Sequence, residues 1–405
     1  MHSQRGWDLS SESVDEVVHT TRSWADARHA YRSKSLRQGL FDGSVVMDDV
    51  LINLHDQDHR DRRRIENPLF RRDVQRVYEA EAFPAVLAAT LAPHLAVGHC
   101  ELLAFGHRVM LNLSCINAGI DRRVGDEAEA SRLLDLLAQF IEGARIRHYQ
   151  GDHVAKAAEI GAAVEAFEVE FIAPSASRRE TLLHSGAAMP RDILGVLVNQ
   201  GDVPLDVMGR EVAFYLTAGA STSAVALTKT FDNIFRWLEL HPGDRARLVE
   251  DPDFVRRCIL ETLRLSPISP IGGRRATEDV TLADGTRVRV GERVDIDIEA
   301  ANRDVSVFGP TSGAFDPERS LPEGVPLHGF SFGHGMHHCI GAELAAGVDP
   351  DPGSGFEDRL FGLVGVVVRE LARHEVRPDP ANPAERDTTT LRTAFRQFPV
   401  LVGPA

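Results

Sequence analysis

The chain has 405 residues, of which 43% are hydrophobic, so it can bury a large core. Its formal net charge is −15, from 45 basic and 60 acidic residues, which argues against a nucleic-acid-binding protein because such proteins present a basic field. The N-terminus lacks the apolar run of a signal peptide, and the longest apolar runs are too short to cross a bilayer. With four cysteines of no paired spacing, we expect a cytoplasmic protein without a membrane anchor.

Apolar residues recur mostly at helical spacing up to about residue 240. We expect one domain over residues 1–405, with a lead at 1–22 that need not be ordered. The stretch 204–240 has a proline at its start, and His241, Pro242 and Gly243 follow its end, which are helix start and stop signals. Such a helix would span about 55 Å and would cross the whole domain.

The pattern changes to alternation between Asp279 and Ala300, and Asp284-Gly285 is a hairpin turn signal. Polar residues, prolines and glycines dominate 302–327, which we interpret as an ordered loop. A short helix should begin just after Cys339. The sequence therefore predicts a mainly α protein with a small antiparallel β region.

The densest motif is the stretch FSFGHGMHHCIGAEL, residues 330–344. Gly333, Gly335 and Gly341 let the backbone turn or lie against a flat object. Cys339 precedes a helix start, where free N–H groups should lower the pKa of its thiol and favour a thiolate. A thiolate held by a loop against a flat ring is what axial ligation of haem iron requires.

Three other interpretations compete for this stretch. Cys339 could be a buried structural cysteine in a glycine turn. A zinc site would use ligand types that are present here, but structural zinc sites combine two separated ligand pairs and no second pair is found. A nucleotide-binding loop would need a strand, a glycine-rich turn and a helix in that order, which this region lacks. The histidines available to the zinc interpretation are His334, His337 and His338.

The stretch resembles the haem-binding loop of the cytochromes P-450, the haem-thiolate monooxygenases. The family pattern of Phe, Gly, Cys and Gly falls on Phe332, Gly335, Cys339 and Gly341. The resemblance implies the cytochrome P-450 fold, with the long helix 204–240 passing over the haem. It also implies haem b (iron protoporphyrin IX), with Cys339 as the axial iron ligand and Phe332, Gly333 and Gly341 lining the cofactor.

Other segments match the family in the right order. The Glu-x-x-Arg pair of the family falls on Glu261 and Arg264, which share a helix face, and its third partner falls on Arg319. Without the family, the first two would be an ordinary surface pair and Arg319 a loop arginine. The resemblance makes all three a structural cluster.

The resemblance also assigns partners to the two haem propionates, which need cations or hydrogen-bond donors. These partners are His59, Arg63, Arg274 and His337. Arg275 is an alternative to Arg274, because the alignment with the family at this point depends on the residues that follow. From the residues alone, the arginine run 62–64 would be a solvated helix face.

The long helix contains the segment Ala218–Thr222, which we call the distal segment because the resemblance places it on the distal side of the haem. Ala218 and Gly219 would leave space there, and Thr222 aligns with the threonine that positions protons. A helical threonine can instead bond to its own backbone. The family's acid at the preceding position is replaced by Ser221, which can relay a proton through water but cannot supply one.

Two further departures concern the chain course. Prolines and glycines at 348–356 should interrupt the helix after Cys339, with Pro350 and Pro352 ending it and a helix resuming near Phe356. The segment that precedes His59 is shorter than is usual for the family, so the N-terminal strands could be shorter or fewer.

The resemblance implies hydroxylation of a small organic natural product, which could be carrier-bound. Dioxygen would be the oxidant, and electrons would come from NAD(P)H through a ferredoxin or flavodoxin and its reductase. Positional candidates for the pocket wall are Phe214, Thr217, Ile268, Ile271 and Phe395. Two alternatives stay open: a haem-thiolate enzyme that catalyses coupling, rearrangement or peroxide-driven oxidation, and a haem sensor or carrier without turnover.

Overall fold

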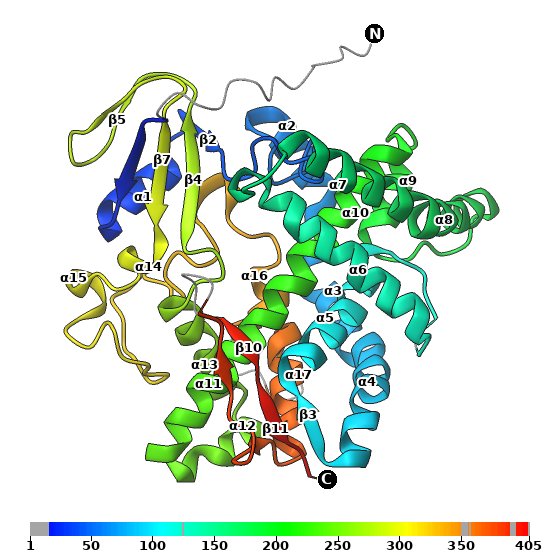
Figure 1. Cartoon of the computed structure of the whole chain (residues 1–405), viewed down its shortest axis with the longest axis vertical. Coiled ribbons are helices and arrows are strands. Elements are labelled where there is room, and N and C mark those ends of the chain that lie inside the picture. Colours follow the sequence, from blue (N-terminus) through cyan, green and yellow to red (C-terminus); the bar gives the residue numbers. More distant parts are fainter. Residues whose placement is uncertain (1–15, 124, 350–354, 356–357, 389–393, 404–405) are drawn as a thin grey trace.

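The computed structural model describes residues 16–123, 125–349, 355, 358–388 and 394–403. Helices dominate these residues, and the largest sheet gathers at one corner of the molecule, at the upper left of Figure 1. The prediction of a mainly α protein with a small β region is confirmed.

The first half of the described chain is almost entirely helical. Aspartates begin several of these helices, because the side chains of Asp126, Asp152 and Asp192 accept hydrogen bonds from free N–H groups of the first turn. The helices are α1 (Trp24–Arg32), α2 (Asp56–Glu66), α3 (Arg72–Val77), α4 (Phe83–Val97), α5 (Leu102–Ala118), α6 (Glu127–Ala144), α7 (His153–Phe167), α8 (Ala173–Ser185) and α9 (Ile193–Gln200).

A π-helical turn joins α3 to α4, so one continuous helix runs over Arg72–Val97. By length and composition alone, this helix could cross a membrane, and no other helix of the described residues meets that test. In the fold, its Phe83, Leu87 and Leu91 pack into the main hydrophobic core.

The predicted long helix forms with the expected ends. It consists of α10 (Leu205–Leu216), a π-helical turn at Thr217–Ser221 and α11 (Thr222–Leu240). Pro204 is its N-cap and His241 its C-cap. It crosses the middle of the molecule diagonally, with α5, α13 and α17 against α11 (Figure 1).

The C-terminal third carries shorter helices around the cysteine loop. They are α12 (Arg247–Glu250), α13 (Pro252–Leu265), α14 (Ile298–Ala301), α15 (Val305–Phe308), α16 (Ala342–Ala346) and α17 (Gly362–Arg373). The predicted helix after Cys339 is α16. Apart from α15, the segment 302–327 contains turns and irregular backbone, as expected for an ordered loop.

The interruption after α16 is set by glycine rather than by proline. Gly347 has a φ of +82°, so the helix ends there, before Pro350, and the prediction that the prolines end it is wrong. A Cβ on Gly362 would lie 2.3 Å from the backbone N of Gly347, so both glycines permit α16 and α17 to meet closely. The predicted restart near Phe356 falls partly outside the described residues, and α17 begins at Gly362.

The largest sheet has the strand order β1-β7-β4-β2. It is mixed rather than purely antiparallel, since β1 runs parallel to β7 while β4 is antiparallel to β7 and to β2. Part of the predicted lead is therefore ordered as β1, whereas residues 1–15 lie outside the described residues. The strands are β1 (Val18–Thr21), β2 (Leu36–Gln38), β4 (Ile271–Ala276) and β7 (Arg293–Asp297).

The predicted hairpin forms around Gly285, whose φ is +88°, and the Asp284 carboxylate accepts a 2.9 Å hydrogen bond from the Thr286 N–H. It pairs β5 (Val280–Thr281) with β6 (Arg287–Val288). The remaining strands form two small sheets near the C-terminus: β3 (His99–Glu101), β11 (Pro399–Leu401) and β8 (Arg377–Pro378) in one, and β9 (Glu385–Arg386) with β10 (Phe395–Gln397) in the other.

Candidate functional site

The cysteine loop is folded back on itself immediately before α16. The N–H of Cys339 donates a 2.8 Å hydrogen bond to the carbonyl of Phe332. Gly333 and Gly335 have φ values of +68° and +71°, and a Cβ on Gly335 would lie 2.6 Å from the carbonyl oxygen of Tyr31. Glycine is therefore required at position 335 both by its conformation and by the close approach of α1.

The thiol of Cys339 differs from the other three. Cys100, Cys115 and Cys258 are buried, whereas the Cys339 side chain is exposed. Burial nevertheless raises the pKa of the Cys339 thiol, although the Gly341 N–H and the charge of Arg63 lower it. The Cys339 side chain is therefore within reach of solvent, although the surrounding protein desolvates its thiol.

The predicted lowering of this pKa is wrong for the chain by itself. The hydrogen bond from the Gly341 N–H exists, but the effect of burial exceeds it. A positive charge at the sulfur, such as a metal ion, would be needed to hold Cys339 as a thiolate.

Histidines and arginines from separate elements gather beside this loop. The rings of His59 on α2 and His337 in the loop have centroids 4.5 Å apart, and the ring of His55 lies 6.4 Å from that of His337. Arg63 donates a 3.4 Å hydrogen bond to the carbonyl of Met336. Nδ1 of His59, Nε2 of His337 and both ring nitrogens of His55 have no hydrogen-bond partner among the described residues.

Two rings of this cluster, His59 and His337, have strongly lowered pKa values. Burial, followed by the charges of Arg63, His55 and Arg60, lowers the pKa of His59 to about 4. Burial lowers the pKa of His337 to about 3, with the charge of Arg274 the next cause. No carboxylate is among the causes of either shift, so His59 and His337 are neutral rings without an anionic partner among the described residues, whereas the Asp56 carboxylate lies 3.7 Å from Nε2 of His55.

The contacts of Arg274 and Arg275 show which of the two is available to bind a propionate. Arg274 is 4% exposed, donates to Gln38 Oε1 (3.0 Å) and its own strand, and lies over the Tyr31 ring. Arg275 turns the other way and pairs with Asp42 and Glu16. Among the described residues Arg274 has no carboxylate partner, which leaves it available to an anionic ligand.

These observations test whether haem fits the residues present. Haem carries two carboxylates, and the cluster offers the buried cation Arg274, the partly exposed Arg63 and ring nitrogens of His59 and His337 without hydrogen-bond partners among the described residues. Its iron needs a fifth ligand, and Cys339 is the one accessible thiol beside the cluster. The residues fit the group. They would hold it through Cys339 at the iron and through His59, Arg63, Arg274 and His337 at the propionates.

The distal segment lies in the π-helical turn and at the start of α11. The hydroxyl of Ser221 donates to the carbonyl of Thr217 (2.6 Å), and that of Thr222 donates to the carbonyl of Ala218. Both hydroxyls are therefore bonded to their own helix, as the alternative interpretation of Thr222 allowed. π-Helical turns inside α-helices occur frequently at functional sites because they displace the helix backbone locally.

Gly219 admits a close neighbour from α5. A Cβ there would lie 2.8 Å from Ser114 Oγ, which is buried and has no hydrogen-bond partner among the described residues. Glycine at 219 therefore allows the two helices to approach at the distal segment.

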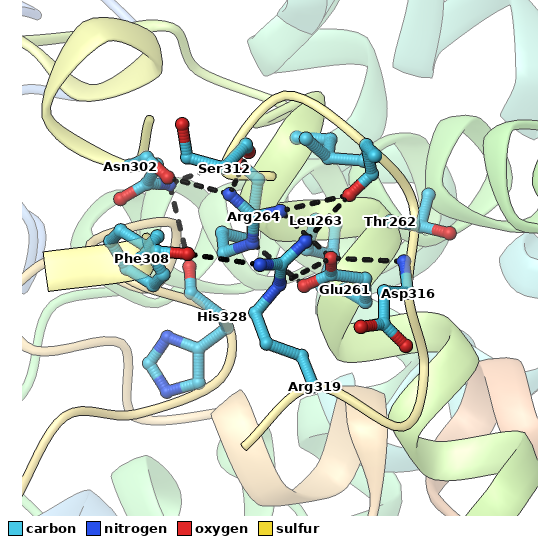
Figure 2. Close-up of polar contacts among 12 residues, drawn as sticks. Glu261, Thr262, Leu263, Arg264, Asn302, Phe308, Ser312, Asp316, Arg319 and His328 are labelled. Atoms are coloured by element: carbon cyan, nitrogen blue, oxygen red, sulfur yellow. Dashed lines mark hydrogen bonds and ion pairs between the residues drawn. The ribbon is translucent and has the colours of Figure 1, made fainter. Parts of the chain in front are cut away.

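Glu261, Arg264 and Arg319 form one buried cluster (Figure 2). The Glu261 carboxylate accepts two 2.7 Å hydrogen bonds from Arg264 and one of 3.0 Å from Nε of Arg319. The remaining guanidinium donors bond to loop carbonyls, including those of Asn302 and Phe308. Two cations thus share one carboxylate and fix the loop that follows α14.

The cluster reaches the cysteine loop through Asn302. Its side-chain amide donates to the carbonyl of Arg264 (3.1 Å), and its Oδ1 accepts from the N–H of Phe330 (2.7 Å). A rigid cluster on α13 therefore positions the backbone that leads to Cys339.

The residues suggested for the pocket wall are not brought together in the same way. Phe214 and Phe395 are buried in the main core, Ile268 packs against it, and Thr217 bonds to the carbonyl of Ala213. Ile271 lies on β4. The substrate-pocket assignment stays a prediction.

Sequence reasoning missed several residues around this site. His55 extends the cation cluster, and Gln38 orients Arg274 from a neighbouring strand. Glu66 and Tyr215 form a buried pair between α2 and α10. Glu66 belongs to a strongly charged segment whose pattern is typical of a solvent-exposed helix. The sequence pattern therefore contains no sign that Glu66, unlike its neighbours, is buried.

Comparison with known proteins gives a consistent result. The sequence model of the family described as Cytochrome P450 matches residues 243–346. The chain is 35% identical over 158 residues to cytochrome P450 105A3 of Streptomyces carbophilus and 40% identical over 167 residues to vitamin D(3) 25-hydroxylase of Pseudonocardia autotrophica. These matches cover 38% and 40% of the chain and 36% of each relative, so the alignments span little more than a third of the relatives' length.

Structural similarity extends much further along the chain. The crystal structure of P450BioI in complex with an acyl carrier protein that bears hexadec-9Z-enoic acid superposes with a TM-score of 0.71 at 18% identity. It covers 95% of this chain and 92% of that one. The fold is therefore shared over nearly the whole length, including segments without detectable sequence similarity.

Proposed function

The chain is a cytochrome P450 of the bacterial type, and on this premise we propose that it is a haem-thiolate monooxygenase that oxidises a small organic substrate. One observation carries the proposal. The accessible Cys339 lies in a loop beside His59, Arg63, Arg274 and His337, which have no carboxylate partner among the described residues. A dianionic, iron-bearing ring satisfies both features at once.

The chain's own residues would divide the work as follows. Cys339 would hold the iron, while His59, Arg63, Arg274 and His337 would bind the propionates and fix the orientation of the ring. Glu261, Arg264 and Arg319 keep the preceding loop in place. When bound, the haem supplies activation of dioxygen, which the anionic sulfur favours.

The distal segment would handle substrate and protons. Ala218 has a small side chain and would leave room beside the helix, whereas the expected space at Gly219 is taken by Ser114 of α5. Thr222 would turn its hydroxyl from the carbonyl of Ala218 towards solvent or substrate. Ser221 can pass a proton on, but its alcohol is not an acid at neutral pH.

We further propose that the substrate is a small natural product, free or carried on an acyl carrier protein. The structural neighbour P450BioI is complexed with an acyl carrier protein that bears a fatty acid, which supports the carrier-bound form. Electrons would come from NAD(P)H through a ferredoxin or flavodoxin and its reductase, in the cytoplasm.

A substrate titration combined with turnover tests this function. Free and carrier-bound acids and natural products should shift the haem absorption, and those that do should give oxidised products with NAD(P)H, a ferredoxin and a reductase. Product formed with peroxide, but not with the redox partners, would favour the peroxide-driven alternative. Haem binding without product under either condition would favour a sensor or carrier.

A further inference from the structure

A second buried polar cluster joins α2 to α10. The side chains of Glu66 and Glu211 are completely buried. The phenol of Tyr215 bonds to Glu66 Oε2 at 2.6 Å, while Arg62 forms an ion pair with Glu211, whose Oε1 accepts a 3.1 Å hydrogen bond from the Leu51 N–H. Oε1 of Glu66 has no hydrogen-bond partner among the described residues. A buried, incompletely bonded carboxyl is costly when ionised.

The charges around this cluster favour a proton on Glu66. Burial raises the pKa of Glu66 well above its usual range, and the charge of Glu211 raises it further, against the effects of Tyr215 and Arg62. Burial also raises the pKa of Glu211, to about 7, although Arg62 opposes this. One cation thus serves two carboxyls, so the carboxyl without the direct ion pair is the neutral one.

Charged groups on the neighbouring segments do not reverse the preference for a protonated Glu66. Asp49 raises the pKa of Glu211. Burial raises the pKa of Tyr215, against the charge of Arg63, so that the phenol keeps its proton. The pair is therefore a carboxylic acid against a phenol, and each group can donate or accept a hydrogen.

The pair lies between the parts of the candidate site. Glu66 follows Arg63 by three residues and His59 by seven, so all three share one face of α2. The Tyr215 ring stacks on Phe70, with centroids 5.8 Å apart, and a Cβ on Gly341 of the cysteine loop would lie 3.8 Å from Phe70.

The same pair also reaches the helix of the distal segment. Tyr215 precedes Ala218 by three residues and Thr222 by seven, about 10 Å along the helix axis. The distal segment offers hydroxyls and no acid, and the acidic residue nearest to it along this helix is Glu211.

We propose that Glu66, acting through Tyr215, stores a proton that is delivered to the distal segment during turnover. The inference rests on the proposed function. In this step the Tyr215 hydroxyl, which donates to Glu66 at rest, turns towards the distal segment and releases its proton there, and the Glu66 proton passes to the Tyr215 oxygen in exchange. Glu66 is left as a carboxylate near Arg62. One proton from solvent then restores it by way of the Glu211 carboxyl, which Arg62 holds in an ion pair without itself carrying the proton.

The variant Glu66→Gln separates this role from a structural one. Glutamine keeps the size, the neutral charge and a hydrogen bond to Tyr215, but it has no acidic proton. Infrared spectroscopy of the resting protein should show the C=O stretch of a protonated carboxyl in the wild type that is lost in E66Q. The matched control Glu79→Gln alters a carboxyl that accepts the N–H groups of Phe361 and Gly362, away from the cluster.

Turnover provides the second measurement, with product counted per NAD(P)H consumed. Proton donation by a positioned group typically contributes at least about a hundredfold to a step, so E66Q and Tyr215→Phe should lower this ratio by about tenfold or more. The wild-type ratio should fall as pH rises and Glu66 loses its proton, whereas E66Q should lack this dependence. Ser221→Asp should restore the ratio in the E66Q background, and E79Q should match the wild type.

A carboxyl band of the same intensity in the wild type and E66Q, or an E66Q variant with the wild-type product ratio and pH profile, would overturn the proposal; Glu211, whose pKa is raised to about 7, contributes equally to both spectra. The infrared measurement needs no turnover. If the wild type forms no product, the proposed function fails, while the band still decides whether Glu66 holds the proton.

Discussion

Arg274 and Arg275 are adjacent on β4 and have opposite environments. Arg274 is buried and, among the described residues, has no carboxylate partner, while Arg275 is half-buried and bonds to both Asp42 and Glu16. Alternation along a strand sends successive side chains to opposite faces, which explains the difference. A resemblance in sequence could not choose between them, but their contacts assign the inward one to an anionic ligand.

Replacing Arg274 should therefore weaken cofactor binding. A hydrogen bond to a charged group contributes about 1.5–3 kcal/mol, so Arg274→Ala should raise the dissociation constant for haem about ten- to hundredfold. Haem transfer to an acceptor protein measures this. The neighbour Arg275→Ala is the control, and equal haem loss from the two variants would refute the assignment.

The Glu261 cluster should be essential to stability. Glu261→Gln would leave Arg264 and Arg319 buried without their shared carboxylate, and removing one partner of a buried ion pair costs about 3–5 kcal/mol. Urea unfolding at equal haem content measures the loss.

The chain supplies a matched control in Glu370 and Arg373, a Glu–Arg pair of the same spacing on α17 that is partly exposed. Exposed pairs contribute about 1 kcal/mol or less, so Glu370→Gln should change the unfolding free energy little. A similar small loss for Glu261→Gln would mean that the cluster does not hold the loop.

Much of this site followed from local signals. Pro204 and His241 marked the ends of the long helix, and the spacing around Cys339 marked its loop, because caps and glycine turns act over a few residues. Gly347 was missed as a helix end because its conformation depends on contact with α17. Glu66 was missed because its burial comes from α10, which is far away in sequence. Contacts between residues far apart in the chain leave no pattern in the local sequence.

Acid should destabilise the haem-free chain through two histidines. The folded-state pKa values of His59 and His337, about 4 and about 3, lie below the ordinary value of about 6.5. The unfolded chain therefore binds protons that the folded chain does not, so the unfolding free energy should fall as pH decreases from about 6.5 towards 4.

Chemical unfolding across this pH range measures the effect. His59→Gln and His337→Gln should each reduce the slope, and bound haem should reduce it too, because its propionates favour the protonated rings. The control His184→Gln changes an exposed ring on α8. A slope unchanged by either substitution would contradict the assignment, whereas a residual slope is expected because burial also lowers the pKa of His328, to about 4.

The hydroxyl of Thr222 should matter for product yield. Thr222→Ala removes the group that could position a proton, so peroxide release should rise and product per NAD(P)H should fall about tenfold or more, whereas Thr222→Ser should retain most of the yield. Thr181, which makes the same backbone hydrogen bond on the exposed face of α8, provides the control Thr181→Ala. An unchanged yield in T222A would assign its hydroxyl to the helix backbone alone.

The central claim is that Cys339 is the axial ligand of a haem. The most direct measurement is the absorption spectrum of the reduced protein under carbon monoxide, for the wild type, Cys339→Ala and the buried-cysteine control Cys100→Ala. We predict the characteristic band of the haem-thiolate family in the wild type and in C100A, and its loss in C339A. A wild type that binds no haem, or a band that persists in C339A, would contradict the account.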